Sequence, residues 1–559
     1  MGLVAETRQA IRDSPRGVFN WYLLMNIAIF ALSGISRGFD EANIASLVVQ
    51  SRFRIKFGLG QQSPDEYANT KGWIVSMFTA GMTLGCLLCL PFNDRIGRRW
   101  TMRLSTLVYV SGVLGQGLCN GNLSGLYASR LIAGLGVGGL TVTPPMYISE
   151  VAPKTIRGLL AVQFAACQQL GVVFGFFINY GITKNYDGTD MQWMFPTLIQ
   201  LLPAAVWGLG LLICEESPRW LLYVGRRTQA VAILAKLRHL PPSHPTVVAE
   251  IAVMEFQILQ EREAATGTSQ WDLFKETFVP VENRRRFCLV MLAHLFSQWS
   301  GGNAITQYLP TILGYLGTSG DTLSLTTGVY AVVKFTTLLI FSLVVVDFVG
   351  RRRSLMAGIT LQILTLVYLA CYLGISREMS TTTLLHTASA TQASKAAIAA
   401  IFVHGVGWVI GWFSMPFLIG SEIFPIRIRS LALSMGMAGH WLFAFGCTRA
   451  TPDLLEVMEE WGAFAFFACI CLVSLVYVFF AMPVSEPTPR YDDGRRERRN
   501  GGGSDSAQDT TGRSLEALDG LFQRPWYTVY QVAYAKEEDE EIEVQAIQER
   551  GKSELAIEA

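Results

Sequence analysis

Four ionisable side chains inside long apolar stretches of the sequence, where a charge is costly, are candidates for chemistry. They are a carboxylate, two cations and a histidine: Asp40, Arg130, Lys334 and His440. A charged group in a hydrocarbon layer is unfavourable unless it is paired or neutralised, so residues of this kind indicate functional sites. A carboxylate can take up and release a proton, and a guanidinium beside it can stabilise the charged form. The lysine could bind an anion, reach toward the interface or pair structurally, and the histidine could bind a hydroxyl or carboxylate or simply pack.

A second set of charged residues occurs twice along the chain at matched spacing. The phrase SEVAPKTIRG at residues 149–158 returns as SEIFPIRIRS at residues 421–430. The phrase DRIGRR at residues 94–99 returns as DFVGRR at residues 347–352. Matched carboxylates and arginines can form ion pairs within and between two related halves. Such pairs would latch one side of the molecule when it is closed and would break when it opens.

A third phrase, ESPR at residues 216–219, has a broken counterpart in SEPTPR at residues 485–490. The alternative is that the arginines only follow the charge rule for cytoplasmic loops, but this does not explain the matched acids. The predicted cytoplasmic gate consists of Asp94, Arg98, Arg99, Glu150, Arg157, Glu216, Arg219, Asp347, Arg351, Arg352, Glu422, Arg427 and Arg429.

The elements that must position these groups are membrane-spanning helices. The chain is 51% hydrophobic and only 16% charged, which is too apolar for a soluble protein of 559 residues. Between residues 21 and 482 there are about twelve apolar stretches of roughly twenty residues, the length that a helix needs to cross a hydrocarbon layer of about 30 Å. The predicted fold class is an all-α membrane protein with twelve transmembrane helices.

Lysine and arginine gather on one side of the predicted spans. They precede the first span, follow the second, fourth, eighth and tenth, and fill the central loop and the tail. This bias places both termini in the cytoplasm. The exceptions lie in the first outer loop: Arg52, Arg54, Lys56 and Lys71. A multi-pass protein of the plasma membrane is expected, with an internal membrane as the alternative.

The repeated phrases divide the chain into two halves of six spans, as in parallel repeats that enclose a site between them. The expected domains are a cytoplasmic N-terminus (1–20), a first six-helix bundle (21–214), a cytoplasmic loop with short helices (215–286), a second six-helix bundle (287–482) and a largely disordered cytoplasmic tail (483–559).

Taken together, these phrases resemble a known family. The further motifs are GFD at residues 38–40, RLIAGLGVGG at 130–139, ESPRWL at 216–221 and QWSGGNAITQYLP at 298–310. With them the chain resembles the sugar porters of the major facilitator superfamily (MFS) over about residues 20–482. The details QWMFPTLIQLLPA and LTTGVYAVVKF are similar to the fungal quinate-permease branch. The resemblance implies two pseudo-symmetric six-helix bundles and a helix in the central loop, for which residues 229–240 have an amphipathic pattern.

The resemblance also implies a proton-coupling pair. In proton-coupled sugar porters an aspartate and an arginine occupy the motif positions of Asp40 and Arg130, whereas facilitative relatives lack the acid. Asp40 is therefore expected to load a proton outside and to release it inside. Two alternatives stay open: a static structural ion pair, or a pair between Asp40 and Arg37, which lies three residues earlier on the same helical face.

The substrate is expected to bind through neutral amides, which satisfy hydroxyl groups without the desolvation cost of full charges. By resemblance these are Gln169, Gln298 and Asn303, whose alternative role is hydrogen bonding between helices. Trp412 is a possible aromatic platform. Further residues are expected at the site. Some differ from the residues that hexose-carrying members of the family have at the same motif positions, and the others lie beside such positions: Gln307, Phe417, His440, Trp441 and Lys334. A histidine beside a membrane lysine favours a polyhydroxy acid such as quinate or a uronate over glucose.

The predicted function is proton-coupled uptake of a small polyhydroxylated solute by alternating access. A facilitative uniporter and a non-transporting nutrient sensor are the alternatives. No enzyme activity, cofactor, metal site or nucleic-acid partner is expected, because the apolar stretches hold no His/Asp/Glu cluster with metal or hydrolase spacing. The expected partners are a sugar or polyhydroxy acid, a proton and the lipid bilayer, and a monomer is expected.

Overall fold

The computed structural model describes Val18 and residues 20–153, 156–265, 270–342, 351–378 and 388–482. Throughout these ranges the chain forms helices and connecting segments, without a strand. The expectations for the N-terminus, up to residue 17, and for the tail lie outside the described residues.

The first half forms a bundle of long helices with a short segment between the first two spans. Its elements are α2 (Trp21–Leu32), α3 (Gly34–Leu47), α4 (Ser51–Lys56), the 3₁₀ turn η2 (Leu59–Gln61), α5 (Pro64–Ile96), α6 (Arg98–Leu118), α7 (Leu123–Val151), α8 (Arg157–Asn185), α9 (Met191–Leu198) and α10 (Leu201–Ile213).

The central loop holds four helices and the second half holds the rest. The loop helices are α11 (Pro218–Tyr223), α12 (Arg227–Arg238), α13 (Pro245–Ala265) and α14 (Gln270–Phe278). The second half comprises α15 (Val281–Trp299), α16 (Gly302–Gln307), α17 (Leu309–Tyr315), α18 (Gly320–Ile340), α20 (Arg351–Glu378), α22 (Ala388–Ile410), α23 (Met415–Ile423), α24 (Ile426–Val457) and α25 (Trp461–Ala481). The helix expected at residues 229–240 is present as α12.

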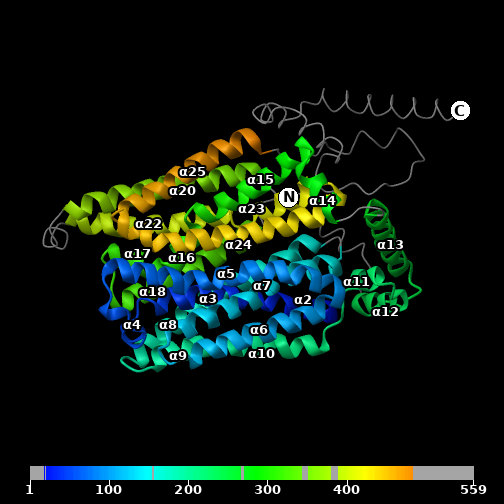
Figure 1. Ribbon diagram of the computed structural model, residues 1–559, viewed down its shortest axis with the longest axis horizontal. Helices are drawn as coiled ribbons and strands as arrows, with labels where there is room; N and C mark the ends of the chain where they lie inside the picture. Colours follow the sequence, from blue (N-terminus) through cyan, green and yellow to red (C-terminus); the bar gives the residue numbers. More distant parts are fainter. Residues whose placement is uncertain are drawn as a thin grey trace.

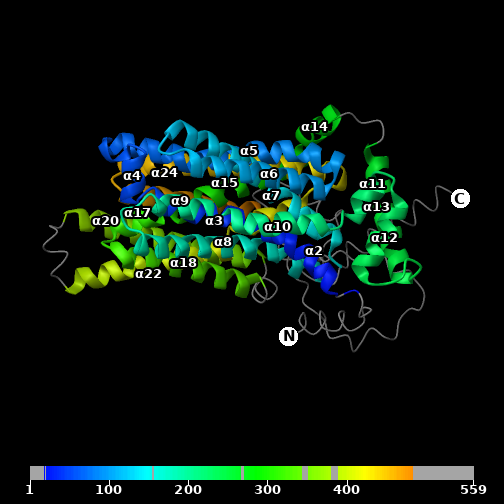
Figure 2. The same ribbon diagram turned by 90° about the horizontal axis from the view of Figure 1, so that it is seen from below.

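The long helices of both halves run roughly side by side, and α11, α12 and α13 lie together beyond one end of the bundle (Figures 1 and 2). We call the end of the bundle beside α11, α12 and α13 the loop end. We call the opposite end, where α4 and α17 lie, the far end. The apolar core is continuous between the halves, because Ile74 and Phe176 of the first half pack in one cluster with Tyr308 and Tyr330 of the second. The two halves therefore meet along a shared interior.

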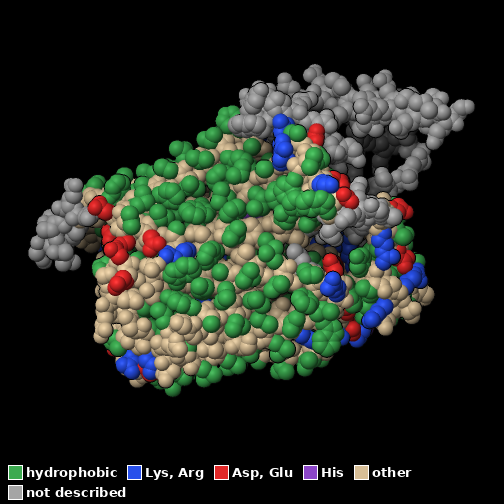
Figure 3. Space-filling model, viewed as in Figure 1, with side chains coloured by type: hydrophobic (Ala, Val, Ile, Leu, Met, Phe, Trp, Pro, Cys, Tyr) green, Lys and Arg blue, Asp and Glu red, His purple; other side chains and the backbone are tan. Residues whose placement is uncertain are grey.

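Ten helical segments of the described chain are long enough and apolar enough to cross a membrane. Many of their large apolar side chains point outward, among them Leu202 and Leu209 of α10 and Leu472 and Val476 of α25. Figure 3 shows hydrophobic and uncharged groups along the side of the bundle, with the charged side chains toward its ends. Such a surface suits lipid rather than water.

The expected count of twelve spans stays a prediction. The positions expected for the third and seventh spans are helical, as α6 and as the series α15, α16 and α17, but neither is among the ten segments. The charged start of α6 reads RRWTMR, and α15 begins with VENRRR. These polar beginnings reduce the apolar length of both helices.

The seventh-span position is a broken helix. The helix α15 ends at Trp299, and Gly301, at φ +89°, precedes the six-residue α16. Tyr308 separates α16 from α17. A positive φ costs glycine little, so the chain can turn there inside the protein. All residues of α16 are buried. A break of this kind leaves backbone groups without helical partners inside the protein, and here it places Asn303 and Gln307 in the interior.

The start of α5 is specified by a capping box. The Ser63 hydroxyl accepts from the backbone N–H of Glu66 at 3.3 Å, and the Glu66 carboxylate accepts from the backbone N–H of Ser63 at 3.1 Å. Pro64 follows at the first helical position, where its missing N–H is not needed. From this start α5 runs 33 residues to Ile96 at the loop end. It thus carries side chains along the whole length of the first half.

Candidate functional site

A fully buried ion pair joins α3 to α7 in the first half. The terminal nitrogens of Arg130 lie 3.1 and 3.2 Å from the two carboxylate oxygens of Asp40, and the two side chains are 1% and 2% exposed. The Nε of Arg130 donates to the carbonyl of Ile74 at 2.5 Å. Its terminal nitrogens also reach the carbonyl of Val75 and the side-chain oxygen of Gln116, both at 3.4 Å. A forked guanidinium–carboxylate pair is the strong form of this interaction.

The segment of α3 that carries Asp40 is pressed against α8. A Cβ added at Gly38 would lie 1.8 Å from the backbone carbonyl oxygen of Gln168. Only glycine permits this approach, which is typical of helix packing in membranes. The close contact fixes the height and rotation of α3, and so it fixes the side chains on both sides of Gly38.

A second buried pair lies on the same helix. A terminal nitrogen of Arg37 is 3.6 Å from a carboxylate oxygen of Glu41, and their side chains are 5% and 6% exposed. The Arg37 guanidinium also lies 4.1 Å from the ring centroid of Trp441 in the second half. The ion pair of Arg37 is therefore with Glu41, while Asp40 is held by Arg130. The alternative pair between Arg37 and Asp40, which the spacing left open, is not the one that forms.

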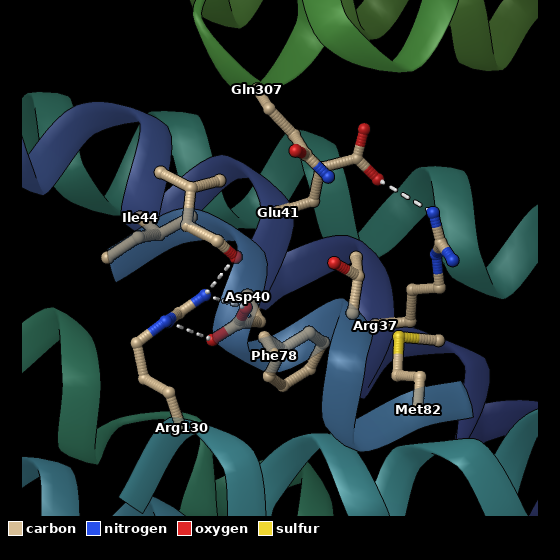
Figure 4. A pocket seen from close by; sticks show the side chains of 10 residues that line it. Arg37, Asp40, Glu41, Ile44, Phe78, Met82, Arg130 and Gln307 are labelled. Atoms are coloured by element: carbon tan, nitrogen blue, oxygen red, sulfur yellow. Dashed lines mark hydrogen bonds and ion pairs between the residues drawn. The ribbon is translucent and has the colours of Figure 1, made fainter. Parts of the chain in front are cut away.

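Both pairs line one pocket between the halves, shown in Figure 4. Arg37, Asp40 and Glu41 come from α3, Arg130 comes from α7, and Gln307 comes from α16 of the second half. The apolar part of the wall is supplied mainly by α5. The side-chain oxygen of Gln307 is buried and has no hydrogen-bond partner in the structure. The pocket therefore offers one amide oxygen and two ion pairs to a bound molecule.

A cluster of amide and imidazole groups lies in the second half, and we call it the amide–histidine cluster: His294, Gln298, Asn303 and His440. The amide nitrogen of Asn303 donates to the oxygen of Gln298 at 2.6 Å, and the amide nitrogen of Gln298 lies 2.9 Å from Nε2 of His440. The Nδ1 atoms of the two histidines are 3.1 Å apart, so one imidazole donates to the other. All four side chains are buried.

The structure thus brings three of the predicted substrate residues into contact and adds a fourth group, His294. Sequence reasoning missed His294, although it lies four residues before Gln298 and hence on the same face of α15. That spacing was the available signal.

Lys334 of α18 is buried beside this region. Its ammonium group donates to the hydroxyl of Thr306 at 3.0 Å and lies 4.6 Å from the ring centroid of Trp408 and 5.6 Å from that of Tyr330. Among the described residues no carboxylate lies within ion-pair distance of it. Aromatic faces stabilise a cation, but less than a carboxylate does when the site is dry. Within the described part of the chain, Lys334 is therefore a buried cation without a counterion.

The remaining predicted substrate residues lie in different surroundings. Gln169 of α8 is 2% exposed, and its side-chain oxygen has no hydrogen-bond partner in the described ranges. Phe417 packs against His294 and His440 at centroid distances of 5.3 and 4.9 Å. Trp412 is fully buried in the apolar core, so its role as a platform stays a prediction.

At the loop end, several of the predicted gate residues form a charge cluster within the first half. Arg98 donates to both carboxylate oxygens of Glu150 at 2.7 and 3.0 Å, and its Nη1 lies 3.8 Å from a carboxylate oxygen of Asp94. The side chains of Arg98 and Glu150 are 10% and 8% exposed. The Arg99 guanidinium donates to the backbone carbonyl of Cys214 at 3.0 Å. The repeated phrases DRIGRR and SEVAP therefore meet in space.

Glu216 closes this cluster from the end of the first half. Its carboxylate accepts from the backbone N–H groups of Arg98 at 3.0 Å, Arg99 at 3.1 Å and Ser217 at 2.9 Å. The approach requires Gly97, whose φ is +90° and whose added Cβ would lie 2.5 Å from the carboxylate. Burial raises the pKa of Glu216, although the three N–H groups favour its charged form.

The other predicted gate residues are placed as follows. Arg157 is exposed at the start of α8, and Arg219 donates to the side chain of Gln257 in α13 at 3.1 Å. Arg352 donates to the backbone carbonyl of Phe479 at 2.5 Å, and Arg351 begins α20. Asp347 lies outside the described residues, as do the side chains of Glu422, Arg427 and Arg429.

At the far end, basic side chains cross from one half to the other. The ammonium of Lys71 in α5 donates to the hydroxyl of Thr311 in α17 at 2.6 Å. Arg449 of α24 hydrogen-bonds the side chain of Asn69 and lies 5.0 Å from the ring centroid of Trp73. The sequence marked Lys71 only as an exception to the charge rule and did not mark Arg449. These contacts tie the two halves together at this end.

Comparisons with known proteins agree with this architecture. Residues 26–487 match the family described as "Sugar (and other) transporter". The chain is 32% identical over 550 residues to a probable quinate permease of Neosartorya fischeri, covering 97% of this chain and 95% of the relative. It is 33% identical over 488 residues to the quinate permease of Emericella nidulans, covering 86% and 89%.

Solved structures of the xylose transporter XylE have a similar fold. One is the MFS proton:xylose symporter bound to 6-bromo-6-deoxy-D-glucose, with a TM-score of 0.67 and 22% identity over 83% of this chain and 97% of that chain. Another is the inward open conformation of XylE from E. coli, with a TM-score of 0.66 and 19% identity over 89% and 100%. At these identities the likeness concerns the fold alone.

Proposed function

This chain belongs to the sugar (and other) transporter family, with the MFS fold and several membrane-spanning helices, and from that premise we propose that it takes up a small polyhydroxylated solute together with a proton. The observation that carries the proposal is the forked pair between Asp40 and Arg130. It is fully buried, and it lines a pocket shared by both halves. A facilitative carrier would not need an acid there.

The proton would act through the charge of Asp40. When the carboxylate is ionised, it holds Arg130 in the fork at 3.1 and 3.2 Å. Protonation removes the charge, so the guanidinium keeps its contacts to the carbonyls of Ile74 and Val75 but loses its counterion. The contacts between α3, α7 and α5 then differ between the two protonation states. A difference of that kind can couple proton binding to a change in which end of the pocket is open.

The available driving force is sufficient for accumulation. A membrane potential of about 100 mV supplies roughly 2.3 kcal/mol for each charge that crosses. A pH difference of one unit adds about 1.4 kcal/mol. For a neutral solute carried with one proton, these energies together correspond to an accumulation of roughly several hundredfold.

The solute would bind between the pocket and the amide–histidine cluster. Gln169, Gln298, Asn303 and Gln307 offer amide groups, and two of them, Gln169 and Gln307, have buried oxygens without a partner. Hydroxyl groups are donors that such oxygens can accept. The relatives named quinate permeases support a polyhydroxy acid as one member of the substrate class. Trp412, Phe417, His440 and Trp441 would shape the second-half wall, with Lys334 beside it.

The two ends of the bundle would open in turn. We assign the loop end to the cytoplasm, with both termini on that side, and the far end to the outside of the plasma membrane. A monomer would suffice, because the pocket is built from both halves of a single chain. The charge cluster at the loop end would latch that end when it is closed, through its second-half counterparts.

The test is uptake of labelled solutes by cells that express the full chain. Hexoses, pentoses, quinate and galacturonate are supplied at acid outside pH, with and without a protonophore. We expect accumulation of at least one solute above its external concentration, and loss of that accumulation with the protonophore. Entry without accumulation would support the facilitative alternative, and no entry above that of empty-vector cells would contradict a transport function.

A further inference from the structure

Arg37 has hydrogen-bonding capacity that the protein does not use. Its Nε and Nη1 atoms are buried and have no hydrogen-bond partner among the residues that the structure describes. The residue is 4% exposed, and its side chain lines the pocket. A buried guanidinium with unsatisfied N–H groups is costly, and the cost is recovered when an acceptor arrives. The acceptor that matches this planar fork best is a carboxylate.

The carboxylate already present does not fill this role. Glu41 lies 3.6 Å from Arg37, beyond the range of a good hydrogen bond, whereas Asp40 and Arg130 are 3.1 Å apart. Arg37 and Glu41 lie four residues apart on one helix, so the backbone of α3 limits how their side chains can meet. A carboxylate on a free molecule has no such restriction. It can form both parallel hydrogen bonds where Glu41 forms none.

The surroundings of Arg37 connect it to the groups that would bind hydroxyls. Its guanidinium lies on the ring of Trp441, and the adjacent His440 contacts Gln298, which in turn accepts from Asn303. Gln307 lines the same pocket as Arg37, and its oxygen is free of hydrogen bonds. An acid held by Arg37 would thus have amide and imidazole groups nearby for its hydroxyls.

The charges in and beside the pocket also favour an anion. Arg130 is balanced by Asp40, and Arg37 is balanced loosely by Glu41. Lys334, which hydrogen-bonds Thr306 next to Gln307, has no carboxylate partner among the described residues. Counted over the described side chains, the region therefore carries an excess of one positive charge. A buried excess charge is unfavourable, and a bound monoanion would remove it.

We propose that Arg37 is the anchor for the carboxylate of a polyhydroxylated monocarboxylic acid, and that Glu41 is an internal competitor that occupies Arg37 loosely when the pocket is empty. This assignment rests on the proposed transport function and specifies the residues that select acids over neutral polyols. Binding of the acid releases Arg37 from Glu41. Glu41 thereby lowers the affinity for acids without affecting neutral solutes.

The experiment measures counterflow in proteoliposomes, which needs no proton gradient and so separates substrate binding from coupling. Labelled quinate and galacturonate are compared with labelled myo-inositol and glucose, using the full chain. The variants are Arg37→Gln and Glu41→Gln. Lys184→Gln, which removes an exposed positive charge of α8, is the matched control for net charge.

Arg37→Gln is expected to raise the KM for the acids by about tenfold to a hundredfold, the value of a charge-assisted hydrogen bond, and to change the KM of a neutral solute less than about twofold. Glu41→Gln is expected to lower the KM for the acids by about threefold or more, because the competitor is gone. This gain keeps the test informative if Arg37→Gln fails to fold. Lys184→Gln should match the wild type for both solute types.

Several results would overturn the assignment. The first is an equal loss of affinity for acids and neutral solutes in Arg37→Gln. The second is a weaker affinity for acids in Glu41→Gln. The third is that the wild-type protein carries the neutral solutes but not the acids. An acid-selective loss in Lys334→Gln together with none in Arg37→Gln would place the anchor on Lys334 instead. If the wild type carries none of the four compounds, the proposed function itself fails, which is a different result from any of these.

Discussion

The two ends of the molecule use their charged side chains differently. At the loop end, Arg98, Glu150 and Glu216 bind one another and the backbone within the first half. At the far end, Lys71 and Arg449 reach across to the other half. The far-end contacts must break if the halves separate there, whereas the first-half cluster at the loop end can move as one body. Among the described residues, hydrogen bonds therefore tie the two halves together at the far end, which the repeated phrases alone did not indicate.

The largest effect is expected when a charged side chain inside the loop-end cluster is replaced. Arg98→Gln leaves the carboxylate of Glu150 buried without its forked partner, and removal of one member of a buried pair costs about 3 kcal/mol. We expect a clear fall in the Tm of the detergent-purified protein. Arg95→Gln, at an exposed position on the same turn of chain, is the control and should change the Tm little.

Addition of Glu150→Gln to Arg98→Gln should recover part of this loss, because no uncompensated charge then remains. If the fall in Tm of the double variant equals the sum of the falls in Tm of the two single variants, the two side chains do not stabilise the protein as a pair. In that case the loop-end cluster would not be the body that the comparison assumes.

The next effect concerns the turn that lets Glu216 reach the backbone. Gly97→Ala places a Cβ 2.5 Å from the Glu216 carboxylate at a backbone φ of +90°, and a strained conformation of this kind costs about 1–3 kcal/mol. Gly188→Ala is the matched control, since its φ is +74° but its Cβ would meet nothing within 4 Å. The Tm of Gly97→Ala should fall further than that of Gly188→Ala. Equal falls in Tm for the two variants would show that the contact between residue 97 and Glu216 does not contribute to stability.

A smaller effect is expected at the far end. Lys71→Met removes the hydrogen bond to Thr311, worth about 1 kcal/mol, which is roughly a fivefold shift between closed and open far ends. Spin labels on the exposed residues Asp187 and Asp321 would report this shift as a larger fraction of long distances. Lys184→Met, at an exposed lysine of the first half, should leave the distribution unchanged. If the distance distribution between the labels is unchanged in Lys71→Met, the hydrogen bond to Thr311 does not hold the far end closed, and the proposed difference between the two ends is wrong.

The smallest effect is a pH dependence at Glu216. Because burial raises its pKa in the folded protein, the folded state binds the proton more tightly than the unfolded state does. Its contribution to stability is therefore full below the unfolded pKa and is lost as the pH rises through the folded pKa. The Tm difference between wild type and Glu216→Gln should shift against the wild type as the pH rises above about 4.5. A difference that is independent of pH would mean that the three backbone N–H groups balance burial, and a shift in favour of the wild type would mean that they outweigh it.

Much of the fold could be predicted from the sequence. Apolar stretches of spanning length and the paired phrases indicated membrane-spanning helices in two related halves. The resemblance of the motifs to sugar porters implied the MFS architecture, which the comparisons confirm. The count of twelve spans stays a prediction, because the arginines at the starts of α6 and α15 shorten the apolar length of both helices. The break at Gly301 was also hidden, since a glycine pair within an apolar run does not reveal which φ it adopts.

The candidate site was only partly predictable. Asp40 and Arg130 were recognised together because each stands in a motif. The sequence did not reveal the ion-pair partner of Arg37. Asp40 and Glu41 lie three and four residues after Arg37 on the same face of the helix, so either could pair with it. His294 was missed because a single histidine in an apolar stretch looks like a packing residue, and its partner His440 is 146 positions away. Contacts across such distances depend on tertiary packing and not on local pattern.

The central claim is that Asp40 carries the proton, and one measurement tests it most directly. Asp40→Asn is reconstituted in proteoliposomes, and accumulation driven by an imposed pH gradient is compared with counterflow of the same solute. The account predicts that accumulation disappears while counterflow persists, because the amide cannot take up the proton but the pocket is retained. Uphill accumulation equal to that of the wild type would contradict it.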